Sequence, residues 1–345
     1  MKYASAWVDH SQVIKILRLD LEEPAADEVV VAVHACGICG TDMHFVKDLP
    51  TGSLTPLGHE VAGSIHACGS AVTDLAVGTK VVVQNNVACN RCAACLDQKP
   101  QNCEHIYTYM DDRAGMAEYL VVPREMVIPF DGLDYPEATL AEPITVALDL
   151  SREAAIELLD DVLIMGPGII GLYCIKLAKL RGARRIVMVG HNLHTKRGRY
   201  RSRVASELGA DLVVDSSVPG WKDTLKAEFP QRFKRVIITS PPSTIADGID
   251  LAGFGGWIVY DGIDFADDAI TIAANDFHFS KKRLIASHAI PNWGFPQAIE
   301  LLTRRLIPPE LLLTHRFRMS DGLEEAFAVF NDPEEEVIKP VVLIP

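Results

Sequence analysis

The chain has 345 residues, enough for two domains of ordinary size or for one large domain. Hydrophobic residues make up 48% of the chain and charged residues 23%, a composition typical of a folded globular protein rather than a disordered or fibrous one. Because 46 acidic side chains outnumber 33 basic ones, the net charge of −13 argues against general binding to nucleic acid or to an anionic membrane, whose phosphates would be repelled.

The sequence gives no sign of export or of a membrane anchor. Residues 1–20 contain Asp9 and Lys15 among apolar residues and lack the basic region and continuous apolar run of a secretory signal. No stretch approaches the roughly 20 apolar residues that span a bilayer. Eight cysteines are too few for a disulfide scaffold in a chain of this length. We therefore expect a cytoplasmic protein with no membrane partner.

The first part of the chain predicts a β-rich domain. Up to about residue 150, short runs rich in β-branched residues alternate with glycine and proline. The clearest of these runs are Glu28–Ala35, Val61–Ala67, Lys80–Gln84 and Tyr119–Pro123.

From residue 161 the pattern changes to apolar strands separated by amphipathic helices, which predicts a parallel sheet with crossover connections and an α/β fold. The predicted strands are Val162–Met165, Arg185–Val189, Asp211–Asp215, Arg235–Thr239, Trp257–Tyr260 and Arg283–Ser287. Two helices and a strand close the chain, at Pro296–Arg304, Asp321–Phe330 and Ile338–Leu343. The acidic run Glu334–Glu336 predicts a solvated turn.

Gly166, Gly168 and Gly171 follow the first of these strands in G-x-G-x-x-G spacing and open a helix that continues through Ile169 and Ile170. Between a strand and a helix this pattern is a strong indication of a dinucleotide site. The first glycine permits a tight turn, the second lets the backbone approach a pyrophosphate, and the third lets the helix pack on the strand. The helix N-terminus offers free N–H groups to the diphosphate.

The end of the second strand bears on the choice between NAD and NADP. An acid there would bind the ribose 2′-hydroxyl and repel a 2′-phosphate, but the chain continues as Gly190, His191 and Asn192. Residues 162–206 contain ten lysines and arginines, Arg197 among them, and no acid. We therefore favour NADP(H), because hydrogen bonds to a charged phosphate contribute about 1.5–3 kcal/mol each. A basic, solvated helix face would instead leave NAD usable.

Four cysteines share one short polar stretch, with spacing C-x2-C-x2-C-x7-C, at Cys89, Cys92, Cys95 and Cys103. Four thiolates on one lobe can enclose a tetrahedral Zn²⁺ and leave no open position, which indicates a structural metal. An Fe–S cluster and disulfides are the weaker alternatives.

A second set of metal-binding side chains is dispersed. It consists of Cys39, with Thr41, Asp42 and His44 close behind it, His59 and Glu60 in a Gly-His-Glu run, and Glu142 before a proline. Thiolate, imidazole and carboxylate from separate loops are what a catalytic zinc with an open position uses. Each residue alone is ordinary, and thiol redox chemistry through Cys36-x-x-Cys39 is an alternative.

The order and spacing of these motifs resemble the zinc-dependent medium-chain alcohol dehydrogenases, and more closely their polyol and sugar dehydrogenase branch. The resemblance covers nearly the whole chain and includes Gly37–His44, Gly58-His59-Glu60, the four-cysteine lobe, Ala117-Glu118-Tyr119, Glu142-Pro143 and the glycine turn. It implies a GroES-like catalytic domain at residues 1–148 and 288–345, a Rossmann domain at 149–287, and an active site in the cleft between them.

The resemblance also implies roles for individual residues. Cys39, His59 and either Glu60 or Glu142 would bind the catalytic zinc, and Asp42 would orient the zinc-bound imidazole. Thr41 would take the substrate proton and pass it through the cofactor ribose to His44. These are expectations carried over position by position.

The implied activity is hydride transfer between NAD(P) and a secondary hydroxyl or ketone of a polyol, sugar, sugar acid or hydroxy amino acid. Simple alcohols are the alternative substrates. A poorer alternative to an enzyme is a non-catalytic protein that binds nucleic acid through its zinc lobe and retains the Rossmann domain as a NAD(P) sensor. The resemblance implies a homodimer or homotetramer. We expect the substrate pocket to be lined by loops around Phe45–Leu57, Tyr107–Arg113 and His288–Phe295. The chain departs from the family at Gly190, in a longer stretch after it, and at Ser240-Pro241-Pro242.

Overall fold

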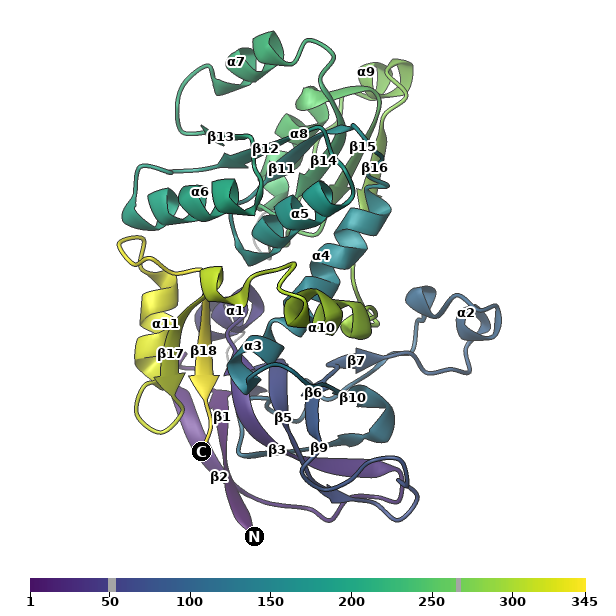
Figure 1. Ribbon diagram of the computed structural model, residues 1–345, viewed down its shortest axis with the longest axis vertical. Helices are drawn as coiled ribbons and strands as arrows, with labels where there is room; N and C mark the ends of the chain where they lie inside the picture. Colours follow the sequence, from purple (N-terminus) through teal and green to yellow (C-terminus); the bar gives the residue numbers. More distant parts are fainter. Residues whose placement is uncertain (49–53, 265–267) are drawn as a thin grey trace. The chain divides into compact units, whose positions relative to one another are not determined.

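The structure, a computed structural model, describes residues 1–48, 54–264 and 268–345 (Figure 1). The chain divides into two compact units. Unit 1 contains Met1–Thr145, Ile290–Asp332 and Lys339–Pro345, and unit 2 contains Val146–Ala289 and Pro333–Ile338. The first passage between the units falls inside helix α4 (Ala141–Glu153). The short return of residues 333–338 to unit 2 is not indicated by any pattern in the sequence.

Unit 1 is built on a sheet with strand order β10-β6-β5-β3-β18-β17, in which β9 also pairs with β3. The strands are β3 (Glu28–Gly37), β5 (Glu60–Cys68), β6 (Lys80–Val83), β9 (Tyr119–Pro123), β10 (Val127–Pro129), β17 (Leu313–Arg318) and β18 (Lys339–Leu343). Valines of β3, β5 and β6 alternate into one continuous core, because successive side chains of a strand face opposite sides of the sheet.

The remaining elements of unit 1 surround this sheet. A second sheet joins β1 (Lys2–Val8), β2 (Ile14–Asp20) and β4 (Thr55–Pro56), and β7 (Asn86–Val87) pairs with β8 (Tyr107–Thr108). The helices are α1 (Gly40–Asp48), α2 (Ala93–Leu96), α3 (Tyr135–Thr139), α10 (Phe295–Thr303) and α11 (Leu323–Asn331). The β1–β2 hairpin and β17 are not among the predicted strands, although residues 14–19 carry part of the apolar-polar alternation of a half-exposed strand.

Unit 2 is a six-stranded parallel sheet with order β13-β12-β11-β14-β15-β16. Its strands are β11 (Asp161–Met165), β12 (Arg185–Gly190), β13 (Leu212–Asp215), β14 (Phe233–Ile238), β15 (Ala252–Tyr260) and β16 (Arg283–Ala286). All six predicted strands are present, with ends that differ by a few residues. The order reverses beside β11, so the chain is wound in both directions from that strand, as in the dinucleotide-binding α/β folds.

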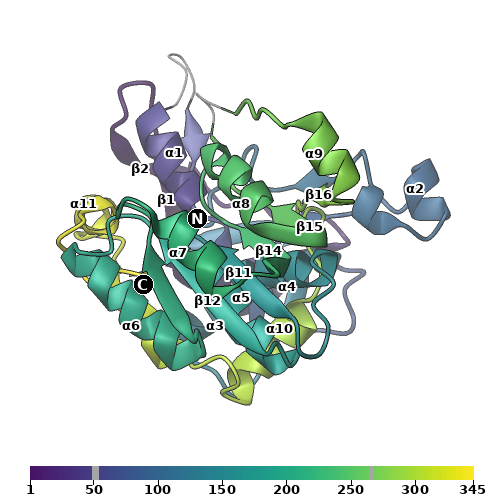
Figure 2. The ribbon, with the colours of Figure 1, turned by 90° about the horizontal axis from the view of Figure 1, so that it is seen from above.

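Helices connect these strands. They are α5 (Ile169–Leu180), α6 (Lys196–Leu208), α7 (Trp221–Glu228), α8 (Ile245–Leu251) and α9 (Ala274–Phe279). Helices α5 and α6 lie together on one side of the sheet, and α7 contacts α8 (Figure 1 and Figure 2). The predicted α/β class, with a β-rich unit and a doubly wound parallel sheet, is confirmed. In the part of the chain that the structure describes, no helix is long and apolar enough to cross a membrane.

Candidate active site

Cys39, His59 and Glu60 come together in unit 1. Cys39 precedes α1, whereas His59 and Glu60 stand at the start of β5, and one donor atom from each lies within 4.8 Å of the others. Glu60 is fully buried and His59 is 5% exposed. Two loops distant in sequence therefore present a thiol, an imidazole and a carboxylate to one point, which is the donor chemistry of a zinc site with an open position.

Asp42 ties these two loops together. It is fully buried, and its carboxylate accepts the backbone N–H of Cys39 at 2.9 Å and that of Gly58 at 2.8 Å. Its Oδ1 lies 3.8 Å from Nδ1 of His59, too long for a hydrogen bond. The structure thus places Asp42 where it fixes both ligand loops, while its orientation of the imidazole stays a prediction.

The carboxylate of Glu60 has two different environments. Oε1 accepts from the buried ammonium of Lys339 at 2.6 Å, whereas Oε2 is buried with no hydrogen-bond partner among the described residues. Opposite it, Gly37 leaves the necessary room, since a Cβ there would lie 2.0 Å from Oε2. Nδ1 of His59 is likewise buried, without a hydrogen-bond partner in the described parts of the chain. A cation at the three donors would give Oε2 of Glu60 a partner, so the residues present fit a metal ion.

Negative charge surrounds His59. Burial lowers the pKa of its imidazole, but the charges of Cys39 and Asp42 and a hydrogen bond to Cys39 outweigh it, so the pKa is raised well above its usual value. An environment that attracts a proton also attracts a divalent cation, and the two compete for the ring nitrogen.

Glu142 lies near this group but outside the set of three donors. It is 7% exposed, and its Oε1 accepts from Nδ2 of Asn85 at 3.2 Å. Burial, opposed by the nearby charge of His59 and assisted by that of Glu60, raises the pKa of Glu142 to about 7. Asn85 is a site residue that no sequence motif indicates, and only its place before the four-cysteine lobe could have suggested it.

Thr41 and His44 stand three residues apart on α1 and so share one side of that helix. Oγ1 of Thr41 lies 3.7 Å from Sγ of Cys39. Residues 49–53 of the predicted pocket loop Phe45–Leu57 lie outside the described residues.

The four cysteines of the lobe form a second cluster. One sulfur atom from each lies within 4.8 Å of the others, and the backbone N–H groups of Cys92 and Cys89 donate to the sulfurs of Cys89 and Cys103 at 3.3 Å. Backbone hydrogen bonds to sulfur favour the thiolate form. At Cys92, hydrogen bonds, of which that from the backbone of Cys95 is the strongest, lower the pKa to about 6. Burial and neighbouring thiols raise the pKa of Cys95 to about 12. Four sulfur donors fit a closed tetrahedral metal site.

The glycine turn lies in unit 2 between β11 and α5. Gly166 has φ of +113°, and a Cβ on Gly171 would lie 1.9 Å from the carbonyl oxygen of Gly166. Nothing lies within 4 Å of a Cβ on Gly168, the residue before Ile169 and Ile170 in the first turn of α5. The middle glycine thus faces open space at a helix N-terminus, where a pyrophosphate would approach.

This turn lines a pocket of about 510 Å³ within unit 2. Gly190 at the end of β12, His191 and Asn192 in the loop after it, and Arg197 and Arg201 of helix α6 line the pocket. None of the described lining residues is acidic. Arg201 donates to the carbonyl oxygen of Val337 at 3.0 Å, and burial, with the charge of Arg197, lowers its pKa to about 10.

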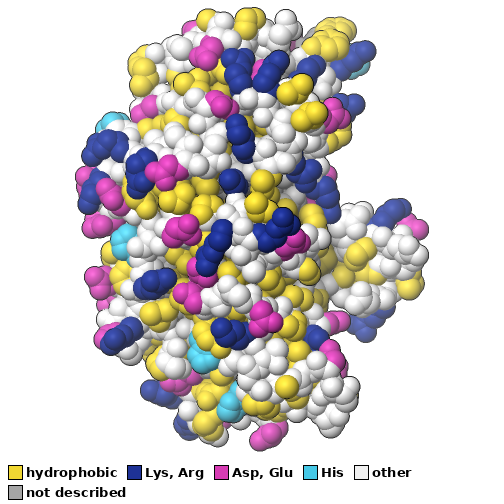
Figure 3. All heavy atoms as spheres, in the orientation of Figure 1, with side chains coloured by type: hydrophobic (Ala, Val, Ile, Leu, Met, Phe, Trp, Pro, Cys, Tyr) yellow, Lys and Arg dark blue, Asp and Glu magenta, His cyan; other side chains and the backbone are white. Residues whose placement is uncertain are grey.

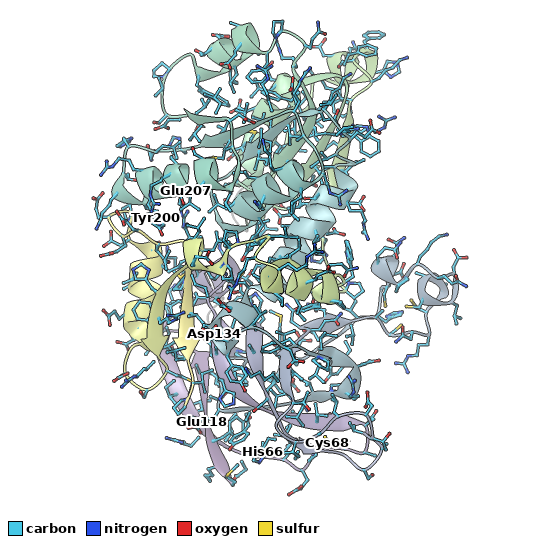
Figure 4. All side chains as sticks on the ribbon, viewed as in Figure 1. His66, Cys68, Glu118, Asp134, Tyr200 and Glu207 are labelled. Atoms are coloured by element: carbon cyan, nitrogen blue, oxygen red, sulfur yellow. The ribbon has the colours of Figure 1, made fainter. Side chains whose placement is uncertain are left out.

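The segment 333–338 therefore does more than form the solvated turn predicted for Glu334–Glu336. Its carbonyl oxygens, those of Pro333 and Val337, accept from the backbone of Arg197 and the side chain of Arg201, so it holds α6 beside the pocket. By contrast, Arg203 contacts Tyr200 and Glu207 along α6 and is not among the residues that line the pocket. Figure 4 labels Tyr200 and Glu207 on this helix.

Comparison with known proteins identifies the family. Residues 25–132 match the alcohol dehydrogenase GroES-like domain and residues 170–304 match the zinc-binding dehydrogenase domain. An L-galactonate-5-dehydrogenase of Escherichia coli (strain K12) is 30% identical over 324 residues, which cover 92% of each chain. An L-arabinitol 4-dehydrogenase of Aureobasidium melanogenum is 30% identical over 333 residues, 92% of this chain and 88% of that one.

A solved structure from Sinorhizobium meliloti 1021, described as a zinc-binding dehydrogenase bound to NADP, superposes with a TM-score of 0.87 at 27% identity and covers 99% of both chains. An Escherichia coli CFT073 alcohol dehydrogenase complexed with NADH gives a TM-score of 0.88 at 25% identity, again over 99% of both chains. The chain belongs to the zinc-binding medium-chain alcohol dehydrogenase family and is an oxidoreductase of the NAD(P)-dependent class.

Proposed function

We propose that this protein interconverts a secondary hydroxyl group of a polyol or sugar acid with the corresponding ketone, using zinc and preferably NADP(H). The observation that carries the proposal is the convergence of Cys39, His59 and Glu60 on one point while the four-cysteine lobe forms a separate, closed cluster. Relatives named for L-galactonate, L-arabinitol and L-idonate support a polyhydroxylated substrate.

The chemistry would be divided between the bound groups and the chain. Zinc held by Cys39, His59 and Glu60 supplies a Lewis acid for the hydroxyl or ketone oxygen, and the nicotinamide supplies or accepts hydride. Asp42 holds the two ligand loops at a fixed separation through its bonds to the backbone of Cys39 and Gly58.

We assign proton handling to α1. Thr41 offers a hydroxyl beside Cys39, and His44 is three residues further along the same side of the helix, so a proton accepted at Oγ1 of Thr41 can be carried toward the imidazole. Oε1 of Glu142 accepts a hydrogen bond from Asn85. Glu142 is a further candidate acid or base near the metal ligands.

The preference for NADP(H) rests on the pocket of unit 2. Arg197 and Arg201 line it, and no acid among the described lining residues is available to bind a ribose 2′-hydroxyl or to repel a phosphate. A guanidinium pair binds a phosphate monoester through charge-assisted hydrogen bonds.

The proposal includes a homodimer or homotetramer in the cytoplasm that binds no nucleic acid. The family resemblance supports the oligomer, and eight free thiols are compatible with a reducing compartment. On the face drawn in Figure 3, basic and acidic side chains are interspersed, and the net charge is −13. Light scattering coupled to size exclusion measures the subunit number.

The decisive experiment is a substrate panel. Zinc-loaded protein is mixed with NADP⁺ or NAD⁺ and with L-galactonate, L-idonate, L-arabinitol, other polyols and simple alcohols, and reduced nicotinamide is followed by absorbance. We expect turnover of at least one polyhydroxylated compound and faster reaction with NADP⁺. Folded, zinc-loaded protein that reduces neither cofactor with any compound would contradict the proposal.

A further inference from the structure

The buried carboxylate of Asp149 has no part in the catalytic scheme above. Asp149 lies on α4, and both it and Ser287 are buried. Oδ2 of Asp149 accepts from the hydroxyl of Ser287 at 2.7 Å, and Oδ1 accepts from the guanidinium of Arg152 at 2.7 Å. Burial of a carboxylate is costly unless such bonds offset it. One of the two oxygens therefore holds the residue that directly follows β16.

Ser287 is the last member of a row of backbone hydrogen bonds along the carboxyl edge of the parallel sheet. For each of β14, β15 and β16, the residue that follows the strand donates its N–H to the last residue of the neighbouring strand. The bonds run from Thr239 to Met165 at 2.8 Å, from Asp261 to Ile238 at 3.2 Å and from Ser287 to Tyr260 at 2.8 Å. Strand β16 is the end strand of the described sheet, so its outer side has no neighbouring strand there. The bond to Asp149 ties this end of the row to α4 instead.

The same edge is where the second nucleotide of the cofactor is expected. Doubly wound sheets bind a dinucleotide across the carboxyl ends of their strands, with one nucleotide on each side of the strand at which the order reverses, here β11. The pocket with Arg197 and Arg201 lies on the side of β12 and would take the adenosine half, and its described lining residues include none from β15 or β16. The nicotinamide half should therefore extend over the carboxyl ends of β14, β15 and β16, where the row ends at Ser287.

We propose that Asp149 is a positioning residue for the nicotinamide half of the cofactor. By holding the hydroxyl of Ser287, its carboxylate fixes the outer end of the row and the backbone groups that follow β15 and β16. Backbone N–H and C=O groups beyond a strand end can bind an amide such as the nicotinamide carboxamide, and a misplacement of about 1 Å weakens such an alignment. The inference rests on the NAD(P)-dependent class of the protein, and not on the proposed substrate or on the preference for NADP(H).

The test compares a whole cofactor with a fragment that lacks nicotinamide. Calorimetric titration of the zinc-loaded full chain gives Kd for NADPH and for 2′-phospho-ADP-ribose, or for NADH and ADP-ribose if the protein prefers NAD(H). Ser287→Ala removes one hydroxyl group. We expect it to raise Kd for the whole cofactor about tenfold, the effect of one lost hydrogen bond to a charged group, and to change Kd for the fragment less than about twofold. A general defect of the fold would raise both values.

A double-mutant cycle shows whether Asp149 acts through Ser287. We expect Asp149→Ala to raise Kd for the whole cofactor as Ser287→Ala does, and the double variant to raise it no further, because each change removes the same bond. Asp149→Asn keeps an oxygen acceptor for Ser287 and is expected to restore most of the affinity. The matched control is Ser206→Ala, which removes an exposed hydroxyl of the same unit that donates to the carbonyl oxygen of Ser202 at 3.2 Å. It should leave both Kd values unchanged.

Equal increases in Kd for cofactor and fragment, no increase for either, or additive losses in the double variant would overturn the inference. A wild-type protein that binds the fragment as tightly as the whole cofactor would do so too. If Asp149→Ala does not fold, Ser287→Ala and Asp149→Asn decide. The titrations do not depend on turnover, so a protein that shows the expected Kd values but oxidises no compound of the substrate panel contradicts the proposed function and supports this inference.

Discussion

Lys339 and Glu60 form an ion pair inside the core of unit 1, with Nζ and Oε1 2.6 Å apart and side-chain exposures of 1% and 0%. The ammonium also donates to the carbonyl oxygen of Ile38 at 2.9 Å. One oxygen of Glu60 is thereby held, and the other has no hydrogen-bond partner among the described residues. The pair fixes the carboxylate at the proposed metal site from a strand that lies far away in the sequence.

Replacing Lys339 by methionine is expected to remove the partner of Oε1 in the buried carboxylate of Glu60 and to lower the free energy of unfolding by about 3–5 kcal/mol. The control is Arg304→Met, which removes the exposed pair of Arg304 with Glu300 and is expected to cost about 0.5 kcal/mol. Urea denaturation of the two zinc-loaded variants gives both values. Equal stability of Lys339→Met and wild type would show that Glu60 is neutral or finds another partner.

This pair illustrates what the sequence does and does not predict. The strands of unit 2 and the glycine turn are encoded locally, by apolar runs and by glycine at fixed spacing, and these patterns predict all six strands. They do not predict the partners of Glu60 and Glu142, because Lys339 and Asn85 reach them only through the tertiary fold. A lysine within an otherwise apolar final strand is the available signal, but it does not name its partner.

The sequence also does not predict which atoms a substituted side chain would contact. From the sequence, Gly190 is the place where an aspartate would create an NAD site. In the structure a Cβ at that position would lie 2.5 Å from Leu193 and 2.9 Å from Pro167, so Gly190→Asp would disturb the loop as well as change its charge. The role of residues 333–338 also depends on their return to unit 2.

The cofactor preference is therefore better tested at Arg201. Arg201→Ala is expected to lower kcat/KM for NADP⁺ about ten- to hundredfold and to change that for NAD⁺ far less, because a charge-assisted hydrogen bond contributes about 1.5–3 kcal/mol. Arg203→Ala is the control, since Arg203 pairs with Glu207 on the same helix. If Arg201→Ala lowers kcat/KM equally for NADP⁺ and NAD⁺, Arg201 stabilises the helix and does not bind the phosphate.

The two zinc sites are expected to respond differently to loss of a cysteine. Cys39→Ala should remove one zinc ion and all hydride transfer while the protein stays folded, because the affected site is catalytic. Cys92→Ala should also remove one zinc ion but lower the melting temperature, because metal bound in a closed site contributes folding free energy. Metal analysis, calorimetry and activity are measured together. Full activity of metal-depleted Cys39→Ala would favour thiol chemistry instead.

Ionisation of Asp261 is expected to contribute to the pH dependence of the free energy of unfolding. Burial, with the charge of Asp149, raises the pKa of Asp261 to about 7. Because the folded-state pKa lies above the unfolded value of about 4, the protonated carboxyl favours folding, and this contribution is lost as the pH rises from about 4 through 7. Asp261→Asn should therefore be more stable than wild type at pH 8 and show a smaller decline between pH 5 and pH 8. The exposed Asp131→Asn is the control, and parallel pH profiles for Asp261→Asn and wild type would contradict the assignment.

Alanine substitutions at Gly168 and Gly171 are expected to affect different properties, cofactor affinity at Gly168 and stability at Gly171. A Cβ at Gly168 meets no atom within 4 Å, so Gly168→Ala should fold with an unchanged melting temperature, but its methyl group occupies the space where a pyrophosphate approaches the N-terminus of α5. Its affinity for NADP(H) should fall at least tenfold by fluorescence titration. A Cβ at Gly171 would lie 1.9 Å from the carbonyl oxygen of Gly166, so Gly171→Ala must displace the turn and should lower the melting temperature. Unchanged affinity in a stable Gly168→Ala protein would place the diphosphate somewhere other than this turn.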